Sequence, residues 1–193
     1  MNLFVLPASV LLLMGSHWTG GVATIHGQAT SVSRVAEAKC IVVELYLSEG
    51  QAASEMALAG AQSVAQSRPG LKLVPRTIET SEKGRARLKK IAQYFKIDES
   101  TTPVIYCGNR IIQSGKTAED FERQLRSVLR IEVYTRIGCS KCQRAKAWLP
   151  TLERQYPGME VVYREITNDA TARQDLNHLV VQHKKAATST PVF

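Results

Sequence analysis

The first patterned part of the chain predicts a strand, a helix and a second strand in succession. A β-branched apolar run at 41–47 predicts a buried strand, and the alanine-rich stretch at 52–66 predicts a helix. Alternation at 71–78 predicts the second strand. Pro69-Gly70 separates it from the helix, because proline and glycine both end helices.

A second helix with a basic outer side follows. Ser81 is a suitable N-cap. Apolar residues at helical spacing mark the inner side: Leu88, Ile91, Ala92 and Phe95. Basic residues mark the outer side: Lys83, Arg85, Arg87, Lys89 and Lys90. We interpret this basic cluster as a solvated helix face and expect no nucleic-acid partner, because no aromatic interleaving or DNA-binding motif accompanies it. Attraction to an acidic protein or membrane surface is the alternative.

A hairpin and a last helix complete this part of the chain. Thr102-Pro103 leads into a strand at 104–106, and Gly108-Asn109 predicts a turn. The returning strand is 111–112, and a helix is expected at 117–129. The order β-α-β-α-β-β-α implies a mixed sheet with helices on its faces, because the first strands need crossover connections and the last pair is a hairpin.

The chain then repeats itself at an offset of 88 residues, the separation of Tyr46 and Tyr134, without a gap. Equivalent pairs include Gly50 and Gly138, Pro69-Gly70 and Pro157-Gly158, Val74 and Val162, Arg76 and Arg164, Ile78 and Ile166, Arg85 and Arg173, Leu88 and Leu176, and Thr102-Pro103-Val104 and Thr190-Pro191-Val192. Glycine and proline occupy positions with special backbone geometry, so their coincidence indicates two copies of one fold.

The second copy predicts the same elements as far as its proline. Its strands and helices are expected at 131–135, 140–155, 159–166 and 170–184. The sequence stops at Phe193, so the counterparts of the last strand and helix are missing, and we expect a C-terminally truncated fragment. The predicted class is α/β, with a first domain at 40–130 and a second, incomplete one at 131–193.

Composition is that of an ordinary globular protein. Of 193 residues, 25 are Lys or Arg and 17 are Asp or Glu, giving a net charge of +8, and 44% are hydrophobic. No apolar run approaches the roughly 18 residues of a membrane-spanning helix. The four cysteines are too few for a small disulfide-stapled scaffold, and only Cys139 and Cys142 are closely spaced.

Residues 1–39 are expected to be an export signal and a linker. An apolar stretch at 3–14 precedes small residues suited to cleavage after Ala23 or Ala29, as in secretory signal peptides. We expect an exported protein, periplasmic or otherwise extracytoplasmic, where disulfides persist. Membrane attachment through a segment beyond Phe193 is an option within this expectation.

Candidate chemistry lies where the first strand of the second copy meets its first helix. Cys139 and Cys142 flank a predicted helix start, where unpaired N–H groups and the helix dipole favour an anion. This setting, with Arg136 and Lys141 close in sequence, is expected to lower the pKa of the Cys139 thiol. We expect Cys139 to be the nucleophile and Cys142 the thiol that resolves a mixed disulfide.

Zinc binding is the alternative for the cysteine pair. A structural zinc site needs two further cysteine or histidine ligands at suitable spacing. His178 and His183 are five residues apart, which does not place them on one face of a helix. The pattern favours redox chemistry, and no metal is expected.

A strand, Gly-Cys-x-x-Cys at a helix start and a later Thr-Pro resemble the thioredoxin superfamily. The run from Tyr134 to Lys146, Tyr-Thr-Arg-Ile-Gly-Cys-Ser-Lys-Cys-Gln-Arg-Ala-Lys, is most similar to its glutaredoxin branch. The resemblance covers about residue 40 onward as two tandem thioredoxin-like folds. It implies that Pro191 is a cis-proline, that the Thr190 backbone pairs with an extended substrate or glutathione, and that no cofactor is tightly bound.

The first copy keeps this framework without the thiols. Gln51 stands at the position of Cys139 and Ser54 at that of Cys142, while Pro103 is retained. This resembles the non-catalytic domains of tandem thioredoxin-like proteins, which bind or space rather than react. Cys107 is expected to be a small buried core residue and Cys40 a spare thiol.

The sequence is therefore compatible with two functions. The leading hypothesis is a thiol–disulfide oxidoreductase that exchanges disulfides of a protein or a low-molecular-weight thiol through Cys139. Its electrons would come from an upstream reductase, glutathione or a membrane electron carrier. The alternative is a polypeptide-binding or chaperone-like module with a structural dithiol, which would tolerate Cys139→Ser.

Overall fold

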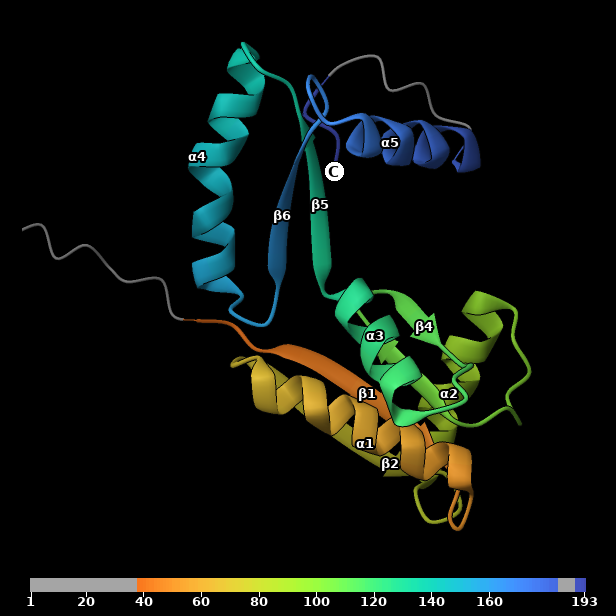
Figure 1. Cartoon of the computed structure of the whole chain (residues 1–193). Helices are drawn as coiled ribbons and strands as arrows, with labels where there is room; N and C mark the ends of the chain where they lie inside the picture. The colour runs from red at the N-terminus through yellow and green to blue at the C-terminus, as the bar shows by residue number, and fades with distance from the viewer. Residues whose placement is uncertain (1–37, 184–189) are drawn as a thin grey trace, which may run out of the picture. The chain divides into compact units, whose positions relative to one another are not determined.

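The computed structural model describes residues 38–183 and 190–193, and the predicted export signal lies outside them. The chain is mixed α/β (Figure 1). Its first half contains β1 (Ile41–Leu47), α1 (Ala52–Ser67), β2 (Leu71–Thr77), α2 (Glu82–Phe95), β3 (Val104–Cys107), β4 (Arg110–Ile112) and α3 (Ala118–Val128). Its second half contains β5 (Arg130–Thr135), α4 (Ser140–Gln155), β6 (Glu160–Glu165) and α5 (Ala170–Gln182).

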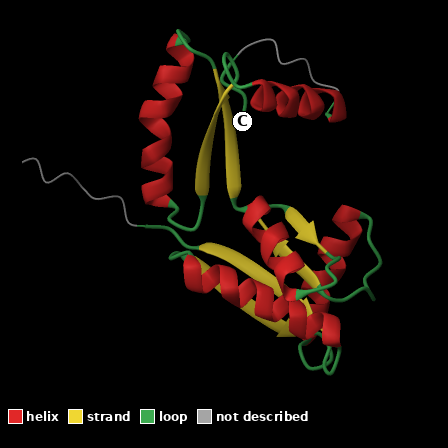
Figure 2. Cartoon of the chain, in the orientation of Figure 1, coloured by secondary structure: helices red, strands yellow, loops and turns green. Residues whose placement is uncertain are grey.

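The first half forms a four-stranded mixed sheet in the order β2-β1-β3-β4 (Figure 2). β1 and β2 are parallel and joined by the crossover helix α1, whereas β3 runs antiparallel to both β1 and β4. The predicted mixed sheet with a terminal hairpin is therefore confirmed. Pro75 lies in the edge strand β2, where a missing backbone donor is tolerated.

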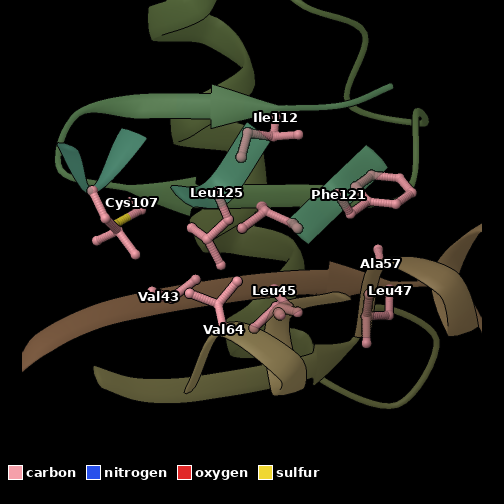
Figure 3. Close-up of a cluster of buried hydrophobic side chains, with 12 residues drawn as sticks. Val43, Leu45, Leu47, Ala57, Val64, Cys107, Ile112, Phe121 and Leu125 are labelled. Carbon is pink, nitrogen blue, oxygen red and sulfur yellow. The ribbon is translucent and has the colours of Figure 1, made fainter. Parts of the chain in front are cut away.

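Helices cover both faces of this sheet because the side chains of β1 alternate between them. Val43, Leu45 and Leu47 pack with α1 and α3, and Figure 3 shows Leu125 pointing toward Val43 and Leu45. Tyr46 points to the opposite face, where it packs with Leu88 of α2. A three-layer α/β/α arrangement results.

The two halves start their second helix in the same way. The Ser81 hydroxyl accepts a hydrogen bond from the Gly84 N–H at 3.0 Å, which confirms the predicted N-cap of α2. Its counterpart Asp169 accepts from the Ala172 N–H at 3.0 Å at the start of α5.

The basic cluster on α2 is exposed at every one of its five positions, as a solvated helix face requires.

The second half repeats the path of the first. β5 and β6 pair in parallel, with α4 and α5 on opposite sides of them (Figure 1). Val192 forms an antiparallel bridge with Tyr134, just as Val104 pairs with Tyr46 88 residues earlier. α4 occupies the predicted residues and α5 is described to Gln182, two residues short of the expected end. Within the described ranges, no helix is both long and apolar enough to cross a bilayer.

Candidate functional site

The centre of the candidate site is a disulfide between Cys139 and Cys142 at the start of α4. The Cα atoms of the two cysteines are 5.2 Å apart, within the usual range for a bridged pair. Gly138 precedes the pair with φ of 75°, a left-handed conformation that glycine adopts without strain. It allows the chain to turn from the end of β5 into the helix.

Helix α4 presents its N-terminus to the sulfur of Cys139. Cys139 is the N-cap residue, and its sulfur accepts a hydrogen bond from the backbone N–H of Cys142 at 3.1 Å. The exposed first turn of a helix carries partial positive charge and favours a negatively charged group. The sulfur that becomes a thiolate on reduction is therefore placed where a negative charge is stabilised.

The two cysteines differ in accessibility. Cys142 has 1% of its surface exposed, whereas Cys139 is only half-buried. An external disulfide or thiol can therefore reach the sulfur of Cys139 more readily than that of Cys142. This difference agrees with the order of reaction expected from the sequence.

The segment 190–193 places a second group beside the disulfide. The Thr190 hydroxyl donates to the Cys139 sulfur at 3.4 Å, and the Thr190 carbonyl oxygen lies 3.7 Å from the same sulfur. Two hydrogen bonds between Tyr134 and Val192, at 2.9 and 3.2 Å, fix this segment to β5. The bond between Thr190 and Pro191 is cis, as expected, and residues 51 positions apart are thereby brought together.

The loop before Cys139 is held by Glu165, which the sequence did not single out. The Ile137 N–H donates to Glu165 Oε1 at 3.3 Å and to Thr167 Oγ1 at 3.1 Å. Glu165 also accepts from the N–H groups of Thr167 and Asn168, at 2.8 and 3.0 Å. Hydrogen bonds from Thr167 and from these backbone donors lower the pKa of Glu165 to about 2.

The first half contains a hydrogen-bonded network at the equivalent place. Gln51 Oε1 accepts from the Ser54 hydroxyl at 3.1 Å and from the Thr102 hydroxyl at 3.0 Å. The Ser54 oxygen accepts from the Ser48 N–H at 3.0 Å, and the bond from Thr102 to Pro103 is cis. The side chains that replace the thiols thus satisfy one another's hydrogen-bonding groups, and neither of them is redox-active.

The remaining predicted residues lie as follows. Arg136 and Lys141 are exposed on either side of Cys139 in sequence, and the Arg136 carbonyl accepts the Cys139 N–H at 3.4 Å. Cys40 is exposed and Cys107 is buried, and both are free thiols. Burial raises the pKa of Cys107 to about 11, as for a core residue.

Metal ligands are not gathered in the described part of the chain, where no group of three or more His, Cys, Asp or Glu side chains could hold an ion. His178 and His183 are both exposed on the surface of α5 or at its end.

No family model matches the chain, and no curated sequence matches it.

Proposed function

We propose that the protein is a thiol–disulfide oxidoreductase that works through Cys139 and Cys142. The observation that carries this proposal is the position of the disulfide: its half-buried sulfur caps a 16-residue helix, and its partner sulfur is buried. A purely structural disulfide has no need for a stabilised thiolate at its accessible end.

The reaction proceeds by two thiol–disulfide exchanges. In the reduced protein, the Cys139 thiolate attacks one sulfur of a substrate disulfide, forms a mixed disulfide and releases the other substrate sulfur as a thiolate, which takes up a proton. The Cys142 thiol then loses its proton and attacks the Cys139 sulfur. This step releases the second substrate thiol and leaves the disulfide found in the structure. The substrate gains two electrons and the protein loses two.

A thiol reductant must return these electrons for turnover. Glutathione, a dithiol protein or a membrane electron carrier acting through a dithiol could each supply them. An exported location, which we also propose from the leader, makes an upstream reductase or carrier the preferred source. Electron flow in the opposite direction, from substrate dithiol to protein disulfide, uses the same two exchanges.

We propose further that the halves are tandem thioredoxin-like domains, at 40–130 and 131–193, and that the second is glutaredoxin-like. The shared β-α-β-α order and the equivalent bridges of Val104 and Val192 support this division. Thr190 and Pro191 would then contact the substrate beside Cys139. The first domain, with Gln51, Ser54 and Pro103 at the matching positions, would be redox-inactive.

The reduction potential of the disulfide tests the function. The full chain is equilibrated in graded thiol buffers, and free thiols are trapped and counted. We expect a reversible two-electron transition that is lost in both Cys139→Ser and Cys142→Ser. A potential near −270 mV, about that of thioredoxin, identifies a reductant, and one near about −120 mV identifies an oxidant. Absence of a reversible transition would overturn the proposal and favour a polypeptide-binding module.

Trapping the mixed disulfide tests the order of attack. Cys142→Ser should accumulate a covalent adduct with a disulfide substrate at Cys139, because the resolving thiol is absent. Cys139→Ser is the matched control and should accumulate little adduct, since Cys142 is buried. An equal yield from the two variants would contradict the assigned roles.

A further inference from the structure

The surface that surrounds the disulfide is basic. Arg136, Lys141, Arg144 and Lys146 are all exposed, and the sequence from 136 to 152 contains no acidic residue. The first turn of α4 likewise contains no acidic residue, although acids there would interact favourably with the helix dipole. Four positive charges therefore lie within 11 residues around the reactive sulfur.

The basic residues around the start of this helix occur only in the half that contains the cysteine pair. The counterparts of the four basic residues in the first half are uncharged: Ser48, Ala53, Met56 and Leu58. Helices α1 and α4, which contain three of the four positions, have the same length and begin with similar N-cap dihedral angles. The fold does not require basic side chains at these positions, so their presence beside the disulfide calls for another reason.

Two of the exposed basic side chains form one stripe along α4. Lys141 and Arg144 are spaced i, i+3, which places them on the same side of a helix. With a rise of about 1.5 Å per residue, the stripe extends roughly 8 Å from Cys139.

Several acidic side chains of the second half have hydrogen-bonding or ion-pair partners of their own. Glu165 accepts three backbone N–H groups, and Glu153 accepts the N–H of Val161 at 3.1 Å. Asp175 pairs with Arg164 at 2.9 Å. Around Cys139, the four exposed basic residues therefore outnumber Glu165, the carboxylate that is hydrogen-bonded to the preceding loop.

We propose that the substrate is a polypeptide whose disulfide or cysteine is flanked by acidic residues, and that it lies along the stripe formed by Lys141 and Arg144. This inference rests on the proposed oxidoreductase function. Opposite charges raise the rate of encounter and disfavour basic partners. A polypeptide with acidic residues on both sides of its cysteine can pair with charges on either side of Cys139, since Arg136 precedes the disulfide and Lys141 and Arg144 follow its first cysteine.

The experiment measures single-turnover exchange, which needs no external reductant. The reduced full chain is mixed with one of two synthetic peptides that contain an intramolecular disulfide, flanked by glutamates in one and by glutamines in the other. One peptide disulfide is reduced for each protein disulfide formed. At low salt we expect the glutamate peptide to react roughly tenfold faster or more, and the ratio to fall toward one at 0.5 M salt, where charges are screened beyond about 4 Å.

Substitutions test whether the preference for the glutamate peptide depends on the stripe of α4. Arg144→Glu should reduce the ratio of the two rates by roughly five- to twentyfold, because it reverses a charge in the stripe. Lys89→Glu, on the exposed basic side of α2, changes the net charge equally and should leave the ratio as it is.

The outcomes separate the two proposals. Exchange with neither peptide would overturn the oxidoreductase function itself. Exchange at equal rates, or a faster reaction of the glutamine peptide, would leave that function intact and overturn the acidic substrate. An equal effect of Lys89→Glu and Arg144→Glu would also overturn it, since net charge rather than the stripe would then determine the preference.

Discussion

Gln51 and Cys139 occupy equivalent N-cap positions of two helices, with φ and ψ of −92° and 117° for Gln51 and −85° and 108° for Cys139. Each accepts a hydrogen bond from the threonine that precedes a cis-proline, Thr102 in one half and Thr190 in the other. One backbone arrangement therefore holds a reactive sulfur in one half and an unreactive amide in the other.

A disulfide should form in the first half when the thiols are restored. Because the N-cap dihedral angles match within about 10°, we expect Gln51→Cys combined with Ser54→Cys to form a bond under mild oxidation. Alkylation followed by mass spectrometry, with and without reduction, would detect it. Gln51→Cys alone is the control and should remain alkylatable. Two free thiols in the double variant would contradict the equivalence of the two helix starts.

The two free cysteines should differ sharply in reactivity. Cys107 is buried and its pKa is raised to about 11, so it should resist iodoacetamide in the native protein at pH 8. Cys40 is exposed and should be modified within the time that leaves Cys107 intact. Peptide mapping after labelling measures both, and labelling in denaturant should modify Cys107 as well. Native labelling of Cys107 at the rate of Cys40 would contradict its place in the core.

Glu165 should make folding stability depend on pH in the acid range. Its pKa is lowered from 4.5 to about 2 by hydrogen bonds from Thr167 and from backbone donors, so the folded state favours the charged form. The stabilisation is present above about pH 4.5 and is lost as the pH falls toward 2. We expect Glu165→Gln to narrow the difference between unfolding free energies at pH 7 and pH 3.

Denaturant titrations at these two pH values test the role of Glu165. Glu99→Gln, at an exposed loop position of the first half, is the control and should leave the difference close to that of the unaltered chain. If the unfolding free energy changes equally between pH 7 and pH 3 in Glu165→Gln and in the unaltered chain, the Glu165 carboxylate is not the source of that change.

Gly60→Ala should destabilise the first half although alanine favours helices. A Cβ at Gly60 would lie 3.0 Å from both the Glu122 nitrogen and the Phe121 Cβ, and closer still to the Ala118 carbonyl oxygen. Backbone atoms cannot move away as a flexible side chain can. The overpacking cost of about 1–3 kcal/mol should exceed the propensity gain of about 1 kcal/mol.

Thermal or denaturant unfolding measures the effect of Gly60→Ala. Gln62→Ala, at an exposed position of the same helix, is the control and should change the unfolding free energy by less than about 0.5 kcal/mol. A stabilised Gly60→Ala variant would show that α1 and α3 do not approach as closely as the structure indicates.

Trp148 occupies the position of α4 that is equivalent to Gly60 of α1. It is exposed, since no helix of the described second half covers it.

Local signals in the sequence determined the elements and their order. The β-branched run at β1, the alternation at β2, the break at Pro69-Gly70 and the cap at Ser81 each act over a few residues, and each predicted element is present. The repeat at an offset of 88 residues predicts the same elements in the second half, where α4 occupies the expected residues. The Cys139–Cys142 pair was equally accessible to sequence reasoning, because both residues belong to one helix start.

Only the tertiary structure brought together groups that are distant in sequence. The approach of Thr190 to Cys139 depends on the pairing of Val192 with Tyr134, and the support that Glu165 gives to Ile137 depends on the parallel register of β5 and β6. A glutamate at a strand end has no local pattern that identifies its partner. Chain packing decides such contacts, because a side chain's hydrogen-bonding partner is fixed by which segments lie side by side, whereas helix and strand periods are properties of each segment alone.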